Sequence, residues 1–321
     1  MTSERLLLAD TADECVEVLW GQLPLFTYVY RVDAPRSESP KPYLHPVRTL
    51  SGDVITGFRP EDHVWHKGVQ MTAPNLSGQN FWGGGTYVHG SGYVDLPNNG
   101  TMEHVEWKEL ETDGTAARLV ERLTWRTAAG EVWIEERRTI EVPRVDSSAG
   151  VYQLSFTFQL RNLASHDLVF ASPAIEGRPD AGYGGLFWRG PDSFVGGRII
   201  AAGGLGGTDI MGSRAQWLAF TGCHDSGSLS TLIFIDDTTN LRYPTEWFVR
   251  TSPIACVSPA LAFSERLTLP AADELTFRHA LVVAAGDVGR ADIERLVAAA
   301  KTDATADADS SPAPKLRASL S

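Results

Sequence analysis

Nine consecutive residues from Tyr152 to Leu160 alternate between apolar and polar side chains. In an extended chain successive side chains point to opposite faces, so this period of two gathers every apolar group on one face. One apolar and one polar face are typical of an antiparallel sheet in a β-sandwich. The apolar face would hold Tyr152, Leu154, Phe156, Phe158 and Leu160, and the polar face Gln153, Ser155, Thr157 and Gln159.

Further strands are predicted at the spacing of β-hairpins. Residues 103–110, 117–127 and 131–142 read as strands, and each of the two short segments that separate them contains a turn glycine. Other strand-like runs occupy residues 16–33, 43–49, 217–222, 229–236, 247–251 and 275–284. Residues 288–301 are expected to form a helix, because Ile293, Leu296 and Val297 recur at helical spacing.

These elements predict an all-β fold, a large antiparallel two-sheet β-sandwich that is supersandwich-like and carries one C-terminal helix. Residues 1–301 are expected to form a single domain, because β-sandwiches of this length commonly occur as one unit. Residues 302–321 are small, polar and proline-containing, which predicts a disordered tail.

Composition limits the classes of binding partner and the cellular compartment that suit this chain. The 321-residue chain has a formal net charge of -12, which argues against nucleic acid or anionic membrane as a partner. It has no run of about 18 apolar residues and no secretory signal, so the prediction is a cytoplasmic protein, with homo-oligomerisation left open. Cys15, Cys223 and Cys256 are too few and too widely spaced for a disulfide scaffold or a zinc ribbon.

Residues 41–96 form the stretch most typical of a functional site. They hold four of the chain's eight histidines, with amide and aromatic side chains, between glycines and prolines. Such groups on glycine-punctuated loops are usual in small-molecule sites. Gly83, Gly84 and Gly85 fit a tight turn or a close approach of the backbone to another group. We expect Asn80 and Trp82 to contribute to substrate binding.

His63 and His66, in the run Asp62-His63-Val64-Trp65-His66-Lys67-Gly68, are the sharpest local feature. A histidine titrates near neutrality and exchanges protons with a substrate, so acid–base catalysis or substrate binding is the first interpretation. A second interpretation is that both rings hold loop backbone. A third is that both bind one metal ion with His45 or a carboxylate. His45 precedes a proline, which favours extended backbone that projects toward the same pocket.

Two other groups of residues are candidates for substrate binding. Strand alternation places Glu136 and Arg138 on the same face as Ile134 and Ile140, where charges serve a pocket floor or form a structural ion pair. Residues 175–194 resemble the histidine-rich stretch, because both place polar and aromatic residues among glycines, and they are predicted to form a second site-forming loop. This loop offers Glu176, Arg178, Tyr183 and Arg189, and the tryptophans Trp65, Trp82 and Trp188 offer flat faces for a sugar ring.

Four motifs, KPYLHPVRTLSG, DHVWHKG, NFWGGGTYV and GRPDAGYGGLFWRGP, resemble a bacterial family labelled "methane oxygenase PmoA" or left as unknown function. The resemblance runs from about residue 43 to residue 284. Its members look like β-sandwich partners of sugar dehydrogenase and glycoside-degradation systems, which implies a carbohydrate substrate. A looser similarity is to aldose-epimerase-like sandwiches, which use histidines and a glutamate on a sugar. The positions that match the family's polar motifs are His45, Asp62, His63, His66, Asn80, Glu176, Arg178 and Arg189.

The leading hypothesis is a carbohydrate-active enzyme that acts on a sugar, a keto-sugar or a glycoside by isomerisation, elimination or hydrolysis. His63 or His66 would be the general base and the other, or His45, the acid, while Arg138 and Arg178 would stabilise negative charge on oxygen. No cofactor is predicted. One alternative is a lyase or hydrolase with a divalent metal on His63 and His66. Another is a non-catalytic carbohydrate-binding module that relies on Trp82 or Trp188.

Overall fold

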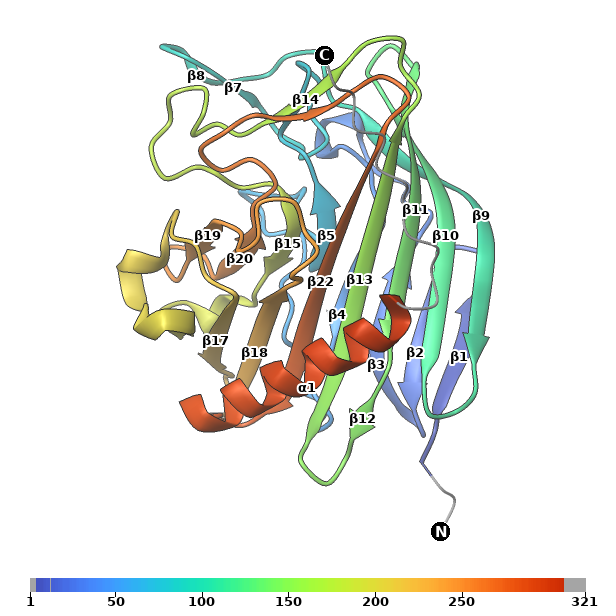
Figure 1. Ribbon diagram of the computed structural model, residues 1–321, viewed down its shortest axis with the longest axis vertical. Helices are drawn as coiled ribbons and strands as arrows, with labels where there is room; N and C mark the ends of the chain where they lie inside the picture. Colours follow the sequence, from blue (N-terminus) through green and yellow to red (C-terminus); the bar gives the residue numbers. More distant parts are fainter. Residues whose placement is uncertain (1–3, 12, 309–321) are drawn as a thin grey trace, which may run out of the picture.

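The computed structural model describes residues 4–11 and 13–308, and its architecture is two large antiparallel sheets packed face to face (Figure 1). The first sheet has eight strands, in the order β1 (Leu6–Thr11), β2 (Cys15–Trp20), β3 (Leu23–Val29), β4 (Tyr43–Val47), β5 (Val69–Thr72), β15 (Gly185–Arg189), β20 (Cys256–Pro259) and β19 (Trp247–Arg250).

The second sheet has nine strands. Its order is β16 (Arg198–Ala201), β17 (Trp217–Cys223), β18 (Leu229–Asp236), β22 (Glu274–Ala285), β13 (Val151–Asn162), β11 (Val132–Val142), β10 (Ala117–Arg126) and β9 (Thr101–Thr112), with β12 (Val145–Asp146) paired to β13. Two small sheets complete the strands: β21 (Leu267–Leu269), β14 (Leu168–Ala171) and β6 (Asn75–Leu76) form one, and β7 (Thr86–Val88) and β8 (Gly92–Val94) the other.

The main core lies between the two large sheets. The five apolar side chains of β13 that alternation assigns to one face, from Tyr152 to Leu160, all belong to this core. Strand β9 extends the expected run by two residues at each end, whereas β10 ends one residue earlier and β11 begins one residue later than expected. The predicted all-β two-sheet sandwich with a C-terminal helix is confirmed.

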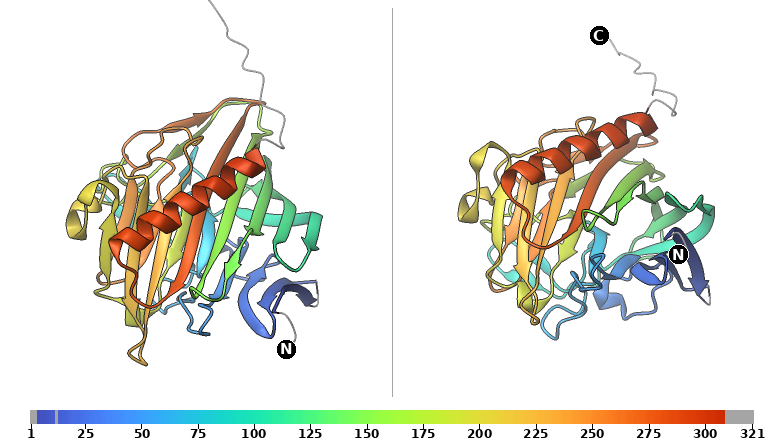
Figure 2. Two further views of the ribbon diagram at one scale, coloured as in Figure 1. Left: turned by 60° about the horizontal axis from the view of Figure 1, so that its bottom comes forward. Right: turned by 90° about the horizontal axis from the view of Figure 1, so that it is seen from below.

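Helix α1 (Arg290–Ala308) lies across the outer face of the nine-stranded sheet (Figure 2). Ile293 and Val297 are buried against Trp217, Ile233 and Val282 in a second apolar cluster. The helix starts two residues later than predicted and continues past residue 301, so the predicted tail begins inside it. Residues 309–321 of that tail lie outside the described residues. No helix in the described part of the chain has both the length and the apolar character needed to cross a membrane.

Strand β15 corrects the expectation that residues 175–194 form one continuous loop. Gly185–Arg189 pairs with β5 and β20 in the middle of the eight-stranded sheet, and all five residues are buried. Leu186 and Trp188 enter the main core, so Trp188 is core and offers no flat face to a ligand. Because both faces of β15 are covered, its sequence carries no alternation of apolar and polar residues.

Four short 3-10 helices complete the described elements: η1 (Arg36–Glu38), η2 (Asp192–Phe194), η3 (Ala202–Gly204) and η4 (Gly207–Ile210). The first precedes β4, and the second directly follows β15. Phe194 of η2 is buried in the main core.

Candidate functional site

The outer face of the eight-stranded sheet presents side chains that point away from the main core. Leu186, Trp188 and Val257 enter the core, so their sequence neighbours in β15 and β20 face outward. The strand register aligns two outward rows: Tyr43, Gln70 and Phe187 in one, and Arg189, Cys256 and Arg250 in the other. These rows form the floor on which the site is built.

Loops from two distant parts of the chain meet above this floor. The ring of Trp82 lies 4.4 Å from that of Tyr183 and 4.7 Å from that of Phe187, measured between centroids. Tyr183 in turn lies 5.4 Å from Phe248 of β19. The two glycine-rich stretches that the sequence marks as site-forming therefore converge. Their aromatic rings form a third apolar cluster, separate from the main core, which we call the aromatic cluster.

His63 and His66 lie on the loop between β4 and β5, beside this cluster. His66 is only 2% exposed, and its ring lies 5.2 Å from Trp82 and 4.9 Å from Phe187. His63 stacks on His66 with centroids 4.8 Å apart, yet its side chain is 38% exposed. The pair thus extends from solvent into a buried aromatic environment.

Buried polar atoms without hydrogen-bond partners concentrate at this place. Of the ten such side-chain atoms among the described residues, seven belong to five neighbours: His63, Trp65, His66, Gln70 and Arg189. Leaving a buried polar group unpaired costs about 1–3 kcal/mol, so such a concentration needs a functional reason. We call these five residues the histidine site.

Nitrogen atoms dominate the unpartnered set. They are Nδ1 of His63, Nε1 of Trp65, both ring nitrogens of His66, and Nε and Nη1 of Arg189, and the single oxygen is Oε1 of Gln70. The indole and the guanidinium only donate, and each neutral imidazole donates once and accepts once. The site therefore suits a ligand that is rich in oxygen acceptors.

Positive charge surrounds His66. Burial lowers the pKa of the His66 imidazole well below its ordinary value, and His63, Arg189 and Lys41 lower it further. His66 is therefore neutral near pH 7, and it can donate or accept a hydrogen bond without carrying charge. The histidine site is locally basic although the whole chain is acidic.

Asp62 lies beside His63 at the exposed end of the site. Its Oδ2 atom lies 2.9 Å from Nδ1 of His63, a contact that becomes an ion pair when the imidazole is protonated. His63 lowers the pKa of the Asp62 carboxyl. A carboxylate on one ring nitrogen orients the imidazole and leaves Nε2 for proton exchange with a substrate.

A buried charge network supports the loop under the site. Glu38, which is 3% exposed, pairs with Lys67 at 2.8 Å and also with Arg59. The ammonium of Lys41 donates to the carbonyl oxygens of Ser39 at 2.8 Å and Trp82 at 2.7 Å. Burial lowers the pKa of Lys41 well below its ordinary value.

Sequence analysis missed Glu38, Lys41 and Gln70. Glu38 and Lys41 fall in a proline- and serine-rich loop whose residues gave no local signal of burial. Gln70 gave a weak signal, since it is a polar residue between Val69 and Met71 in an otherwise apolar strand.

His45 is not brought to the histidine site by its contacts. Its Nδ1 atom lies 2.9 Å from Oγ1 of Thr56, and its ring stacks on Phe58 with centroids 4.6 Å apart. Burial and the nearby Arg48 lower the pKa of His45 to about 4. These neighbours are separate from those of His63 and His66, so His45 is held in place as a neutral ring on the same side of the sheet.

Asn80 organises the loop that carries Trp82. Its Oδ1 atom accepts from the backbone N–H groups of Trp82 and Gly83 at 2.8 and 3.0 Å, while Nδ2 donates to the carbonyl oxygen of Gly84 and to Thr86. Asn80 is 1% exposed and its amide is fully engaged. It positions the loop rather than presenting its amide to a ligand.

Glu176 and Arg178 lie at the outer edge of the aromatic cluster. Glu176 pairs with Arg266 at 2.9 Å, and Arg178 lies over the ring of Tyr93 and donates to its hydroxyl. The Tyr93 hydroxyl is also 2.8 Å from that of Tyr183, whose pKa burial raises well above its ordinary value. Arg178 is therefore linked to the aromatic cluster by its hydrogen bond to Tyr93, which in turn contacts Tyr183.

Arg138 and Glu136 lie on the other side of the eight-stranded sheet, between the two sheets. Arg138 donates to both carboxylate oxygens of Glu136, at 2.6 and 3.0 Å, and to the hydroxyl of Tyr28 at 3.2 Å. Tyr28 also donates to Glu121, which pairs with His104 at 2.7 Å. The structure thus gives Arg138 the role of a core ion pair and does not bring it to the histidine site.

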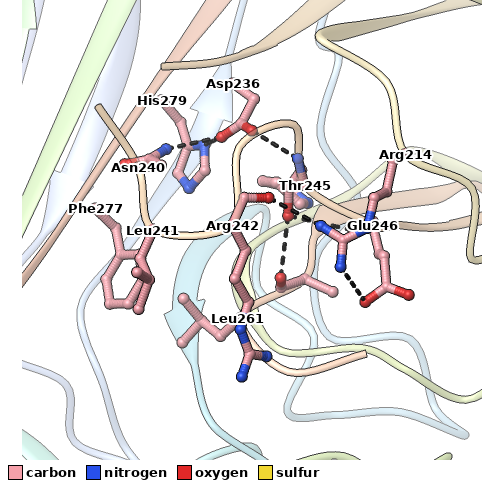
Figure 3. A pocket seen from close by; sticks show the side chains of 12 residues that line it. Arg214, Asp236, Asn240, Leu241, Arg242, Thr245, Glu246, Leu261, Phe277 and His279 are labelled. Carbon is pink, nitrogen blue, oxygen red and sulfur yellow. Dashed lines mark hydrogen bonds and ion pairs between the residues drawn. The ribbon is translucent and has the colours of Figure 1, made fainter. Parts of the chain in front are cut away.

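A second buried polar cluster lies where β18 meets β22 (Figure 3). Asp236 accepts from Nδ2 of Asn240 and from the N–H of Thr245, both at 2.7 Å, and lies 3.5 Å from Nδ1 of His279. Burial raises the pKa of Asp236 to about 6 and lowers that of His279 to about 4. The adjoining cavity is about 20 Å³, room for about one water.

Within the described residues, no group of three or more histidine, cysteine, aspartate or glutamate side chains is arranged to hold a metal ion. The rings of His63 and His66 lie 4.8 Å apart, but Arg189 and Lys41 lie near enough to His66 to lower its pKa.

Comparison with known families gives one match, from residue 15 to residue 298, to the family of unknown function DUF6807. No curated protein matches the chain. The expected resemblance to a family of unknown function is confirmed.

Proposed function

The chain belongs to the DUF6807 family, whose function is unknown, and from its histidine site we propose that it is an enzyme acting on a sugar or glycoside by histidine acid–base catalysis. The observation that carries this proposal is the concentration of unpartnered buried N–H groups beside a half-exposed histidine that contacts a carboxylate. Several donors next to aromatic rings suit a sugar, which presents many oxygen acceptors and apolar C–H faces.

His63 is assigned as the general base. It is exposed enough to exchange protons with water, and the contact of Asp62 with Nδ1 holds the orientation of the imidazole ring. With a keto-sugar, Nε2 would take the proton from the carbon next to the carbonyl, and the electron pair would move to the carbonyl oxygen as an enediolate. Returning the proton to the former carbonyl carbon, while the hydroxyl proton of the enediolate passes to the other oxygen, gives isomerisation. Expelling a substituent with its bonding electrons from the carbon on the other side of the deprotonated carbon gives elimination. A positioned base of this kind contributes about 10²–10⁴-fold to a rate.

Arg189 and His66 are assigned to the oxygen that becomes negative. Arg189 has two unpartnered N–H groups in a buried position, and neutral His66 supplies one more donor without competing for the proton. Fixed donors in a water-poor site stabilise developing negative charge strongly. Arg189 takes the role that sequence analysis gave to Arg138 and Arg178, because those two side chains are engaged elsewhere.

The test is hydrogen exchange at carbon. Purified protein is incubated in heavy water with a panel of keto-sugars and glycosides, and deuterium incorporation and product formation are followed by NMR. His63→Ala should reduce both rates by about 10²-fold or more, and Arg189→Met by a similar factor. His166→Ala is the matched control, because His166 is exposed and its ring meets Trp133 of β11 edge to face. Unchanged rates in His63→Ala, or no exchange with any sugar in the wild type, would remove the proposal.

The metal-dependent alternative rests on the 4.8 Å stacking of His63 and His66. Two nearby cations disfavour a bound metal cation by repulsion, which is why we rank this alternative second. Elemental analysis of protein purified without a histidine tag separates the two, since a stoichiometric divalent metal would convert both rings from acid–base groups to ligands.

The binding-module alternative now rests on Trp82, because Trp188 lies in the main core. It predicts sugar binding that survives loss of His63 but not loss of Trp82. The likeness to the family labelled "methane oxygenase PmoA" and to aldose-epimerase-like sandwiches, the cytoplasmic location and homo-oligomerisation stay predictions from the sequence.

A further inference from the structure

A groove of about 530 Å³ lies beside the aromatic cluster, beyond β19. Its volume falls within the range of about 300–1,000 Å³ that is usual for small-molecule sites. The residues that line it include Asp180, Arg198, Ile199, Met211, Arg250 and Thr251. None of these was singled out by the sequence except Asp180, as part of the second glycine-rich stretch.

Strand register and aromatic contacts link the groove to the histidine site. Arg189 and Arg250 each pair with Cys256, from opposite sides, so they lie in one outward row. With strands about 4.8 Å apart, their Cα atoms are roughly 10 Å apart, a span longer than one sugar ring.

The aromatic rings make the same connection. Tyr183, which packs on Trp82 at the histidine site, lies 5.4 Å from Phe248, and the guanidinium of Arg250 lies 5.4 Å from the Phe248 ring centre. One wall of rings therefore runs from His66 to the groove.

The lining of the groove fits a polyhydroxylated ring. Arg250 donates from Nη2 to the carbonyl oxygen of Asp180 at 3.1 Å, and among the described residues no carboxylate lies within salt-bridge distance of its guanidinium. The exposed carboxylate of Asp180 supplies acceptors, while Met211 supplies apolar surface. Donors, acceptors and apolar patches together are what the hydroxyls and C–H faces of a sugar need.

An anionic or purely apolar occupant fits less well. Arg198 already pairs with Asp287, and Asp180 would repel an anion. Charged and polar side chains on several sides of the groove would lose water without compensation against an apolar ligand.

We propose that this groove is a second sugar-binding subsite, so that the substrate is a disaccharide or a longer glycoside. Its reacting ring lies at the histidine site and its second ring in the groove. The proposal rests on the proposed function, which supplies the first ring, and it names the substrate class of that same site.

Binding measurements with matched probes test it. Glucose is compared with cellobiose and maltose, and the 3-keto form of each is included, by ligand-observed NMR and calorimetry. Arg250→Ala and, independently, Asp180→Asn should weaken disaccharide binding about tenfold or more, and change monosaccharide binding less than about twofold. Asp180 is exposed, so its conservative variant should fold normally. Arg137→Ala, on the outer face of the opposite sheet and paired with Glu109, is the control.

The outcomes separate the two proposals. Equal losses for mono- and disaccharides, or no loss in either groove variant while wild-type protein binds both, would overturn the second subsite and leave the proposed function standing. Failure of every sugar to bind the wild type would overturn the proposed function and the subsite with it. Loss confined to disaccharides would support both.

Discussion

The imidazole rings of His63 and His66 stack 4.8 Å apart although one is 38% exposed and the other is buried. The same ring type thus meets water at one end of the stack and the aromatic rings of Trp82 and Phe187 at the other. Environment therefore separates the two histidines, which is how a site obtains two functions from one residue type.

Titration of the histidine rings by NMR should show this separation. His66 should stay neutral at pH values where an ordinary imidazole takes up a proton, because burial, His63, Arg189 and Lys41 all lower its pKa. Arg189→Met removes one of those charges, so the pKa of His66 should rise while staying below its ordinary value, because burial is the largest cause. An ordinary midpoint for His66 in the wild type would contradict its buried position.

Gly84 should be intolerant of a side chain for a reason that Gly90 lacks. Both have positive φ, +64° and +77°, so alanine costs about 1–2 kcal/mol of backbone strain at either. At Gly84 an added Cβ would also lie 2.6 Å from the ring of Trp65, whereas nothing lies within 4 Å at Gly90. Overpacking of this kind typically costs a further 1–3 kcal/mol.

Chemical denaturation of Gly84→Ala and Gly90→Ala measures the difference. Gly84→Ala should be the less stable of the two by about 1–3 kcal/mol, and it should also bind sugars more weakly because Trp65 belongs to the histidine site. Equal losses of stability would mean that the close packing of Trp65 on the glycine run is unimportant.

Alternation of apolar and polar residues predicts a strand where only one of its faces is covered. Residues 152–160 alternate because one face of β13 enters the main core, and the hairpin glycines after β9 and β10 are fixed by the turns themselves. Strands β5, β15 and β20 lack this signal because loops bury their second face. Their position follows from long-range pairing and loop closure, which a local pattern does not record.

The site divides in the same way. His63, His66, Trp82 and Arg189 were predicted because polar and aromatic groups on glycine-rich segments are unusual wherever they occur. Their proximity rests on the pairing of β5 with β15, across more than a hundred residues of sequence, which no local motif specifies. His45 is close to His63 in sequence, yet its ring contacts Thr56 and Phe58 instead of His63. Closeness in sequence therefore did not predict closeness in space.

Arg138→Met should destabilise the protein strongly while sparing its chemistry. The substitution leaves the Glu136 carboxylate, which is 0% exposed, with the indole N–H of Trp125 as its remaining described donor. Breaking a buried ion pair from one side costs about 3–5 kcal/mol. Catalysis by the folded fraction should be unchanged, because the eight-stranded sheet separates Arg138 from the histidine site.

Removing the partner charge as well supplies the control. The double variant Arg138→Met with Glu136→Gln should recover part of the lost stability, since no unpaired charge then stays in the core. If Arg138→Met abolished turnover in protein that remained folded, the original expectation that Arg138 stabilises substrate charge would return in place of Arg189.

The Asp236 and His279 pair should make two opposing contributions to the pH dependence of stability. Burial raises the pKa of Asp236 to about 6, so its contribution is present below its ordinary pKa and is lost as pH rises through about 6. Burial lowers the pKa of His279 to about 4. Between about pH 6.5 and pH 4 the unfolded chain therefore binds a proton at His279 that the folded protein does not bind, so stability is lost as pH falls through this range. In the wild type the two trends offset each other.

Single substitutions should expose each trend. Relative to wild type, Asp236→Asn should lose stability as pH falls from about 6.5 to 4, and His279→Gln should gain it, each by an amount on the order of 2–3 kcal/mol. The measurement is urea denaturation across this range, compared as slopes so that a uniform loss from either substitution cancels. Asp225→Asn, in the exposed turn between β17 and β18, should keep the wild-type slope. Parallel slopes in all four proteins would mean that Asp236 and His279 do not titrate as their burial requires.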